Sequence, residues 1–219
     1  MAPAQANQSI LSGLDVMQEV IAAGAPLGSR EVARRLQMEH SRANRILGTL
    51  AAGGMLQQNG ESKYLPGPRI HVLSALSLHA SGLIAAALPV LRPIQERGAV
   101  VALGTLWRDT VVYLLHGNPG DDLAATAGAH ASFPRERSIL GAVLGGDGGA
   151  ELPATAWADR PPEENRGEQR TWAARIGRGG TAAIAAVLPA HHPDADPPER
   201  MLDELRTGAE QIARAVEGS

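Results

Sequence analysis

The sequence contains no cysteine, which excludes a disulfide-stapled scaffold, a thiolate-ligated metal centre and a cysteine nucleophile. Long apolar runs are also missing. The longest, residues 99–107 and 181–190, are far too short to cross a bilayer, and residues 1–9 lack the basic and apolar stretches of a secretion signal. These absences predict a cytoplasmic protein without a membrane segment.

Two residue classes are scarce. Aromatic residues make up 3% of the chain, and Lys63 is the single lysine among 20 basic residues. The formal net charge of −3 argues against a protein that coats nucleic acid non-specifically. The charge is unevenly distributed, because residues 1–78 hold seven basic and five acidic side chains, a net charge of +2, whereas the remainder carries −5. Opposite signs of this kind are typical of a nucleic-acid-binding head joined to another domain.

The N-terminal part predicts two helices in succession. Apolar residues recur at helical spacing from Ile10 to Ile21, which predicts a first helix with Ser9 as its N-cap. Residues 22–26 (AAGAP) break this helix, and Ser29 can cap a short second one.

A third helix and a hairpin follow. Residues 41–52 predict a helix ended by Gly53-Gly54. Its apolar face consists of Ala43, Ile46, Leu47 and Leu50. Two short strands, residues 55–58 and 63–65, flank Asn59-Gly60, a strong hairpin signal. Three helices followed by a hairpin form a winged helix-turn-helix, whose third helix fits the major groove.

The polar face of the third helix, the adjoining helix N-termini and the hairpin supply groups that can bind base edges or phosphates. The candidate DNA contacts are Ser29, His40, Ser41, Arg42, Asn44, Arg45, Thr49 and Lys63. The alternative interpretation is a solvated helix face that carries ordinary surface arginines.

Two linker helices are expected next, at residues 69–78 and 82–97. Ser81 caps the second, and Pro89 and Pro93 are expected to kink or shorten it. Linker helices of this kind suit dimerisation, and packing of the second helix on the chain's own C-terminal domain is an equally good interpretation.

The remaining sequence is rich in β-strand patterns. Strands are expected at residues 99–107, 110–116, 171–176 and 181–188, and helices at residues 135–146 and 198–216. The intervening residues 117–131 and 148–170 are expected to be loops. Strands and helices segregated in this way predict an α+β, sensor-like domain with an antiparallel sheet.

Two further patterns suggest other chemistry. The segment His191-His192-Pro193-Asp194 offers metal ligands, but a solvated linker explains it better because consecutive histidines point in different directions. Residues 177–180 (GRGG) stop short of a dinucleotide fingerprint and indicate a hairpin turn. Because hydrolase, phosphate-loop and zinc-protease motifs are also absent, we expect no enzyme, no metal and no cofactor.

Several segments resemble the isocitrate lyase regulator (IclR) family of bacterial transcription factors. The head motifs are residues 26–56 (PLGSREVARRLQMEHSRANRILGTLAAGGML) and the wing exit, residues 63–70 (KYLPGPRI). In the second domain, residues 110–117 (TVVYLLHG) and 171–190 (TWAARIGRGGTAAIAAVLPA) resemble strands of the family's effector domain. The resemblance covers nearly the whole chain.

The resemblance implies a homodimeric or tetrameric repressor or activator that binds palindromic double-stranded operator DNA, and of the two roles we expect repression. A small organic or aromatic acid bound to the second domain would tune its DNA affinity, through residues that the sequence does not identify. Matching of the motifs puts Ser41, Arg42, Asn44 and Arg45 on the recognition helix, with His40 just before it.

The second domain departs from the family pattern. Ala186 and Leu188 stand where family pockets commonly use hydroxyls, residues 132–141 (SFPRERSILG) replace a His-Ala-Thr motif, and residues 146–170 are shorter than usual. These departures predict a shortened effector domain with a more apolar ligand or none.

The sequence therefore predicts four regions. They are a disordered N-terminus (1–8), a winged helix-turn-helix domain (9–68), linker and dimerisation helices (69–97) and an effector-binding-like α+β domain (98–219). A rival hypothesis is a ligand-sensing or protein-interaction module whose head no longer binds DNA.

Overall fold

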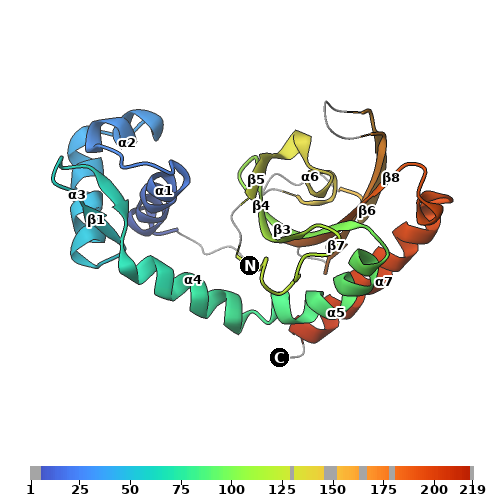
Figure 1. Ribbon diagram of the computed structural model, residues 1–219. Coiled ribbons are helices and arrows are strands. Elements are labelled where there is room, and N and C mark those ends of the chain that lie inside the picture. The colour runs from blue at the N-terminus through green and yellow to red at the C-terminus, as the bar shows by residue number, and fades with distance from the viewer. Residues whose placement is uncertain (1–5, 129–130, 146–151, 163–166, 178–180, 218–219) are drawn as a thin grey trace. The chain divides into compact units, whose positions relative to one another are not determined.

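The computed structural model describes residues 6–128, 131–145, 152–162, 167–177 and 181–217. The chain divides into two compact units, Met1–Ser77 and Leu78–Ser219 (Figure 1). Residues 1–5 of the segment predicted as disordered, and residues 178–180 of the predicted GRGG turn, lie outside the described residues. Gln8, also in that segment, already belongs to the first helix.

The first unit consists of three helices and a hairpin, in the predicted order. Its elements are α1 (Gln8–Ala22), α2 (Ser29–Arg35), α3 (His40–Ala52), β1 (Leu56–Gln58) and β2 (Tyr64–Pro66). The helices pack around Val16, Val20, Val32 and Leu47. Strands β1 and β2 pair antiparallel. This arrangement confirms the predicted head.

Two predicted helix caps are wrong. Asn7, not Ser9, caps α1, because its side-chain oxygen accepts hydrogen bonds from the backbone N–H groups of Ser9 and Ile10. Gly28 stands at the N-cap of α2, so that Ser29 is the first helical residue and its hydroxyl is free to bond elsewhere.

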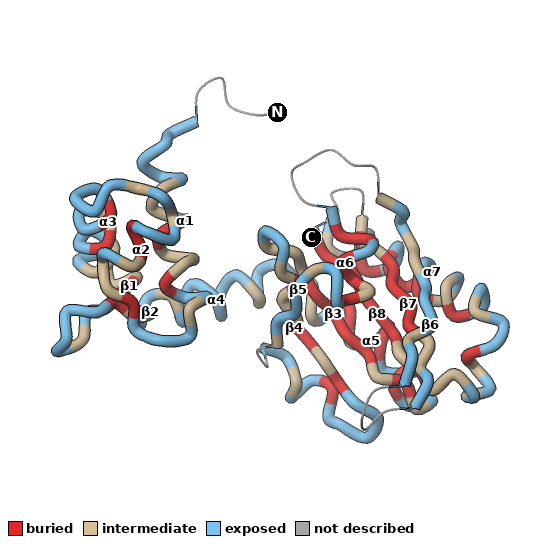
Figure 2. Tube along the Cα trace, turned by 90° about the horizontal axis from the view of Figure 1, so that it is seen from above, coloured by how far each residue is buried: buried red, intermediate tan, exposed pale blue. Residues whose placement is uncertain are grey.

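Helix α4 (Pro68–Ala80) follows the hairpin and contains no buried residue, as Figure 2 shows by its lack of red segments. Helix α5 (Leu83–Glu96) begins after Gly82, whose φ is 62°, and continues through Pro89 and Pro93. Ser81 accepts a hydrogen bond from the Leu83 N–H at 3.3 Å. Among the described helices, no single one is long and apolar enough to cross a membrane. Helices α4 and α5 meet the criteria of length and composition only when the two are counted together across the bend between them.

The second unit is built on a six-stranded sheet in the order β5-β4-β3-β8-β7-β6. All of its neighbouring strands are antiparallel, as predicted. The strands are β3 (Val100–Trp107), β4 (Thr110–Gly117), β5 (Ala131–Pro134), β6 (Thr155–Arg160), β7 (Gln169–Ile176) and β8 (Ala182–Pro189).

Helices cover both faces of this sheet (Figure 1). On one face, α5 and α7 (Pro198–Glu217) pack against Trp172, Ile184 and Leu188. On the other, the short α6 (Leu140–Val143) packs against Ala173, Ala183 and other small residues. Packing on the sheet therefore accounts for the apolar stripe of α5.

Two predictions for this unit are wrong. Residues 148–170 were expected to be a loop, yet β6 lies there and pairs with β7, with Trp157 opposite Trp172. Residues 135–146 were expected to form one helix, but only a 3₁₀ turn (Arg135–Arg137) and α6 form. Ser138, between the two turns, is extended, which interrupts the helix, and a Cβ at Gly141 would overlap the Arg135 carbonyl oxygen, so that only glycine allows the two turns to lie this close.

Candidate nucleic-acid interface and cavity

Helices α2 and α3 are joined by a tight turn that fixes how α3 is presented. Gln37 in this turn has a φ of 50°, and Val32 and Leu47 bury the inner sides of the two helices. The Ser29 hydroxyl and the His40 Nε2 share a hydrogen bond of 2.9 Å, which connects the two helix N-termini. Ser29 and His40, two of the predicted DNA contacts, are therefore hydrogen-bonded to each other beside the start of α3.

The outer face of α3 is polar and exposed. Ser41, Arg42, Asn44, Arg45 and Thr49 are all exposed, while Ala43 and Leu47 are completely buried. The predicted division of this helix into an apolar and a polar face is thus confirmed.

The polar side chains of α3 differ in how they are held. Arg42 donates to the hydroxyl of Ser12 in α1 at 2.8 Å, and Thr49 donates to the Arg45 carbonyl at 2.9 Å. Among the described residues, the side chains of Asn44 and Arg45 have no hydrogen-bond partner. Arg45 and Asn44 are consequently the donors most readily available to a ligand.

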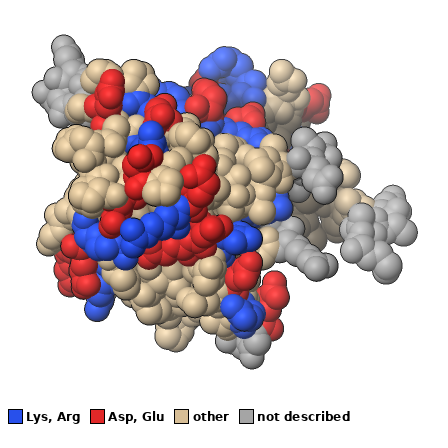
Figure 3. Space-filling model, turned by 90° about the vertical axis from the view of Figure 1, so that its right-hand side faces the viewer, with Lys and Arg blue, Asp and Glu red and all other residues tan. Residues whose placement is uncertain are grey.

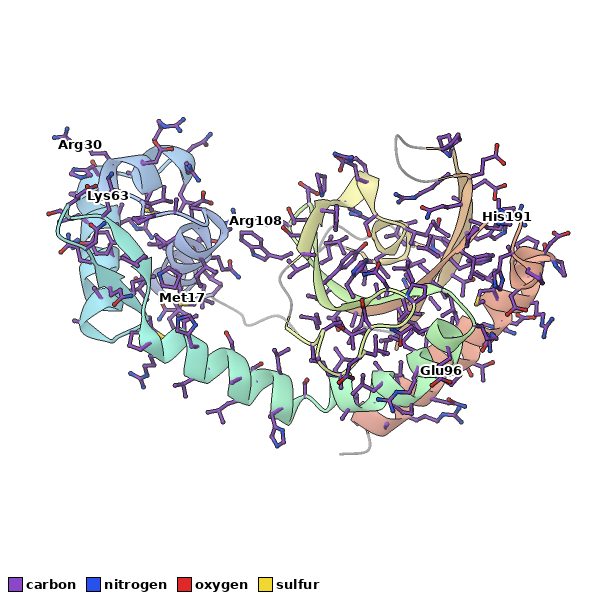
Figure 4. All side chains as sticks on the ribbon, viewed as in Figure 1. Met17, Arg30, Lys63, Glu96, Arg108 and His191 are labelled. Carbon is purple, nitrogen blue, oxygen red and sulfur yellow. The ribbon has the colours of Figure 1, made fainter. Side chains whose placement is uncertain are left out.

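Two of the head's arginines are committed to ion pairs within the unit. The Glu31 carboxylate accepts from Arg34 at 2.7 and 3.0 Å and from Arg35 at 2.8 Å, and Arg35 also bonds Glu19 in α1 at 3.0 Å. Hydrogen bonds from Arg34 and then Arg35 lower the pKa of Glu31 to about 2. Arg30, by contrast, extends away from the body of the unit (Figure 4).

Hydrogen bonds fix the hairpin both at its loop and at its second strand. Its Asn59 side chain accepts from the backbone N–H groups of Glu61 and Lys63 at 3.1 and 2.9 Å. Backbone hydrogen bonds between Tyr64 and Leu27 join β2 to the segment before α2. The Lys63 ammonium lies 2.8 Å from the Glu61 carboxylate and lowers the pKa of Glu61. Lys63 therefore stands near the tip already paired with an acid.

The head and linker also expose apolar side chains. On α1 these are Ile10, Leu11, Leu14 and Ile21, and on α4 they are Val72, Leu73 and Leu76. Ile10, Leu14 and Ile21 lie on one side of α1 because they are spaced by four and seven residues. The buried side of α1 carries Val16 and Val20 instead. Both helices thus have an apolar face that nothing in the described chain covers.

The second unit contains a cavity of about 550 Å³ on the α6 side of the sheet. Its polar lining comes from Tyr113, His116, Asn118, Glu136, Arg137, Ser138, Arg160, Gln169 and Thr171. Its apolar lining includes Ala102, Phe133, Ile139 and Ala185. Polar groups of several kinds therefore surround this space, while the expectation of a more apolar ligand or none stays a prediction.

The lining side chains are ordered by contacts with one another. The Tyr113 ring stacks on His116, with centroids 5.5 Å apart, and its hydroxyl lies 3.0 Å from the buried Ser138 hydroxyl. Arg160 donates to the Arg137 carbonyl at 2.7 Å, which brings its guanidinium to the cavity. A guanidinium beside aromatic rings can bind an anionic group attached to a planar ring.

The residues singled out on β8 lie on the wrong face. Ala186 and Leu188 pack into the core beneath α5 and α7, whereas Ala185 and Val187 line the cavity. Sequence reasoning missed the cavity residues Tyr113, Arg137 and Arg160. Alternate residues of a strand point to opposite faces of the sheet, and this alternation could have separated cavity residues from core residues. It was not applied to Arg160 because residues 148–170, which contain β6, were predicted to be a loop.

Of the two adjacent histidines, His192 has a structural role. The His192 Nδ1 accepts a hydrogen bond from the Asp194 N–H at 3.1 Å and so caps the short turn before α7. Across the part of the chain that the structure describes, no group of three His, Asp or Glu side chains is placed to hold a metal ion. On the face of the molecule seen in Figure 3, basic and acidic side chains adjoin rather than form a patch of one sign.

Comparison with known proteins gives matches for both units. A family model described as the IclR helix-turn-helix domain matches residues 9–60. The HTH-type transcriptional regulator BhcR of Paracoccus denitrificans is 32% identical over 114 residues, and the match covers 51% of this chain and 40% of that protein. The chain thus spans less than half the length of this relative.

Solved structures resemble the whole fold. An IclR family transcriptional regulator from Brucella abortus has a TM-score of 0.67 at 16% identity, over 100% of this chain and 96% of that one. An IclR homologue from Microbacterium hydrocarbonoxydans, complexed with 4-hydroxybenzoate, has a TM-score of 0.57 at 18% identity, over 97% of this chain and 100% of that one. At these identities the similarity is one of fold alone.

Proposed function

We propose that the chain belongs to the IclR family and is a sequence-specific DNA-binding transcriptional regulator, because residues 9–60 match the family's helix-turn-helix model and an HTH-type transcriptional regulator is 32% identical to it over 114 residues. The observation that carries this proposal is the exposed polar face of α3, presented by the family's helix-turn-helix. In the complex, α3 enters the major groove, where Arg45 and Asn44 bond base edges. Arg42 and Ser41 bind bases or phosphates beside them.

The remaining candidates bind the DNA backbone. Ser29 and His40 lie at the N-termini of α2 and α3, where backbone N–H groups and the helix dipole favour a phosphate. Thr49 contacts the groove wall, and Lys63 reaches the backbone once it leaves Glu61.

The regulator acts as a homodimer on a palindromic operator, and in tetramers where two dimers associate. Support comes from the uncovered apolar faces of α1 and α4, which a second copy would bury across a two-fold axis. Two heads then read two half-sites, and the separation of the two α3 helices determines operator affinity. Repression follows where the operator overlaps a promoter, in the cytoplasm, and no catalytic step is involved.

The second unit binds the signal. We propose a small organic anion with a planar ring as the ligand of the 550 Å³ cavity. Arg160 and Arg137 would bind its anionic group, and Tyr113 and His116 its ring. The 4-hydroxybenzoate complex of the Microbacterium relative supports this ligand class. Ligand binding would shift the population of dimers whose heads match the operator spacing.

The test is selection of duplexes from a random pool, followed by affinity measurement at several salt concentrations. The selected duplex should bind far more tightly than a random one, and affinity should fall steeply with salt. Arg45→Ala should weaken operator binding by ~1–3 kcal/mol and relax specificity at one base pair. Arg92→Ala, which removes an exposed arginine from α5, serves as the control and should bind as the wild type does.

A chain that binds no duplex even at low salt would favour the rival hypothesis of a sensing or interaction module without DNA binding. A loss with Arg45→Ala that is uniform across all sequences would instead make Arg45 a phosphate contact.

A further inference from the structure

Gly48 lies in the interior of α3, an unfavourable place for glycine. The helix continues from His40 to Ala52, and glycine in a helix interior is less favourable than alanine because it loses more backbone freedom. Gly48 is exposed, and a Cβ built on it would meet no heavy atom within 4 Å. Packing within the chain therefore gives no reason for a glycine at this position.

The position of Gly48 on the helix suggests another reason. It follows Arg45 by three residues and Ser41 by seven, so these three residues lie on one side of α3. That side faces away from the buried Ala43 and Leu47. If α3 enters the major groove, the line through Ser41, Arg45 and Gly48 faces the base pairs, with Asn44 directly beside this line and Arg42 toward a groove wall.

We propose that Gly48 is a specificity-determining residue: it lets the base-pair edges approach the α3 backbone closely enough for the neighbouring Arg45 to reach its base. This inference rests on the proposed DNA binding. A side chain at residue 48 would hold the helix away from the floor of the groove, and the loss would fall on base contacts. Phosphate contacts, made by long or flanking side chains, adjust to such a shift.

The experiment compares Gly48→Ala and Gly48→Leu with Gly13→Ala in the full-length chain. Gly13 lies in the interior of α1, and a Cβ there also meets nothing within 4 Å. Both alanine variants should therefore raise the melting temperature of the N-terminal unit, by about 4–8 °C if the head unfolds as one unit. Stability and DNA affinity are thereby separated.

Operator affinity should change at residue 48 alone. Gly13→Ala should bind the selected operator as the wild type does, Gly48→Ala more weakly, and Gly48→Leu at least about tenfold more weakly, the cost of one lost base contact. Binding of Gly48→Leu to random duplex should stay within about twofold of the wild type.

Wild-type affinity of Gly48→Leu for the operator would overturn the proposal, and so would an equal loss on operator and random duplex. A loss of affinity in Gly13→Ala equal to that of Gly48→Ala would overturn it as well, since helix stiffening alone would then explain both. A wild-type chain that binds no duplex would refute the proposed function itself, a result distinct from these three.

Discussion

Replacement of Leu76 by aspartate tests whether α4 forms the interface between two copies of the chain. Leu76 is 60% exposed, and its neighbours Val72 and Leu73 are 56% and 44% exposed. Complete burial of a leucine contributes roughly 1.5–3 kcal/mol, so covering the exposed part of Leu76 contributes about 1–2 kcal/mol in each copy. Two copies related by a two-fold axis contribute about 2–4 kcal/mol, which is about 30- to 700-fold in the dimer dissociation constant.

Ser74→Asp provides the matched control. It places the same charge on the same helix, and residues two apart do not face each other. Sedimentation equilibrium over a range of protein concentrations should show dissociation of Leu76→Asp and wild-type assembly of Ser74→Asp. Both variants should retain the wild-type melting temperature of the monomeric units, because neither residue is buried. Equal dimer dissociation constants for Leu76→Asp and the wild type would refute the assignment of α4 to the interface.

Three further predictions concern the ion pairs, the helix packing and the cavity. Since the pKa of Glu31 falls from 4.5 to about 2 on folding, its carboxylate stabilises the fold above about pH 4.5, and this contribution is lost as the pH falls toward 2. The difference in melting temperature between Glu31→Gln and the wild type should therefore shrink between pH 6 and pH 2; a constant difference would contradict the assignment. Gly208→Ala should destabilise the second unit by about 1–3 kcal/mol, because the added Cβ would overlap Val90 Cγ1 where α5 and α7 cross. In denaturant titrations, the additional substitution Val90→Ala should recover the lost stability. With 4-hydroxybenzoate as the probe for the proposed class of ligand, we expect a rise in the melting temperature of the second unit in the wild type and none in Arg160→Ala; an equal rise in both would exclude Arg160 from the anion site.

The head could be predicted almost completely, because each of its signals is local. Helical spacing places Ala43 and Leu47 on the buried side of α3, and Asn59-Gly60 predicts the hairpin without any distant contact. The apolar residues of α1 show the limit of this approach. Val20 and Ile21 fit the same helical pattern, yet Val20 is buried and Ile21 exposed, since periodicity does not distinguish a core from a surface left for a partner.

The second unit could be predicted less completely, because its strands and its cavity depend on contacts between residues far apart in the sequence. Strand β6 is an edge strand whose alanines, charges and single tryptophan give weak alternation, and its hydrogen bonds to β7 are what define it. The cavity depends on residues from β4, β6, β7 and the α6 region meeting on one face. The count of charged residues gives the net positive charge of the head, but only the structure shows that Arg34 and Arg35 form ion pairs with Glu31 inside it.

The alanines around the cavity have a thermodynamic consequence. Four alanines line the cavity where larger side chains would fill it: Ala102, Ala142, Ala158 and Ala185. Because their side chains are short, the protein alone makes fewer van der Waals contacts here than a well-packed interior does. A bound molecule would supply those contacts, adding about 2.7 kcal/mol of stability when present at a hundred times its dissociation constant. The melting temperature of this unit would then report the concentration of its ligand directly, and a larger residue in place of one alanine would imitate the occupied state.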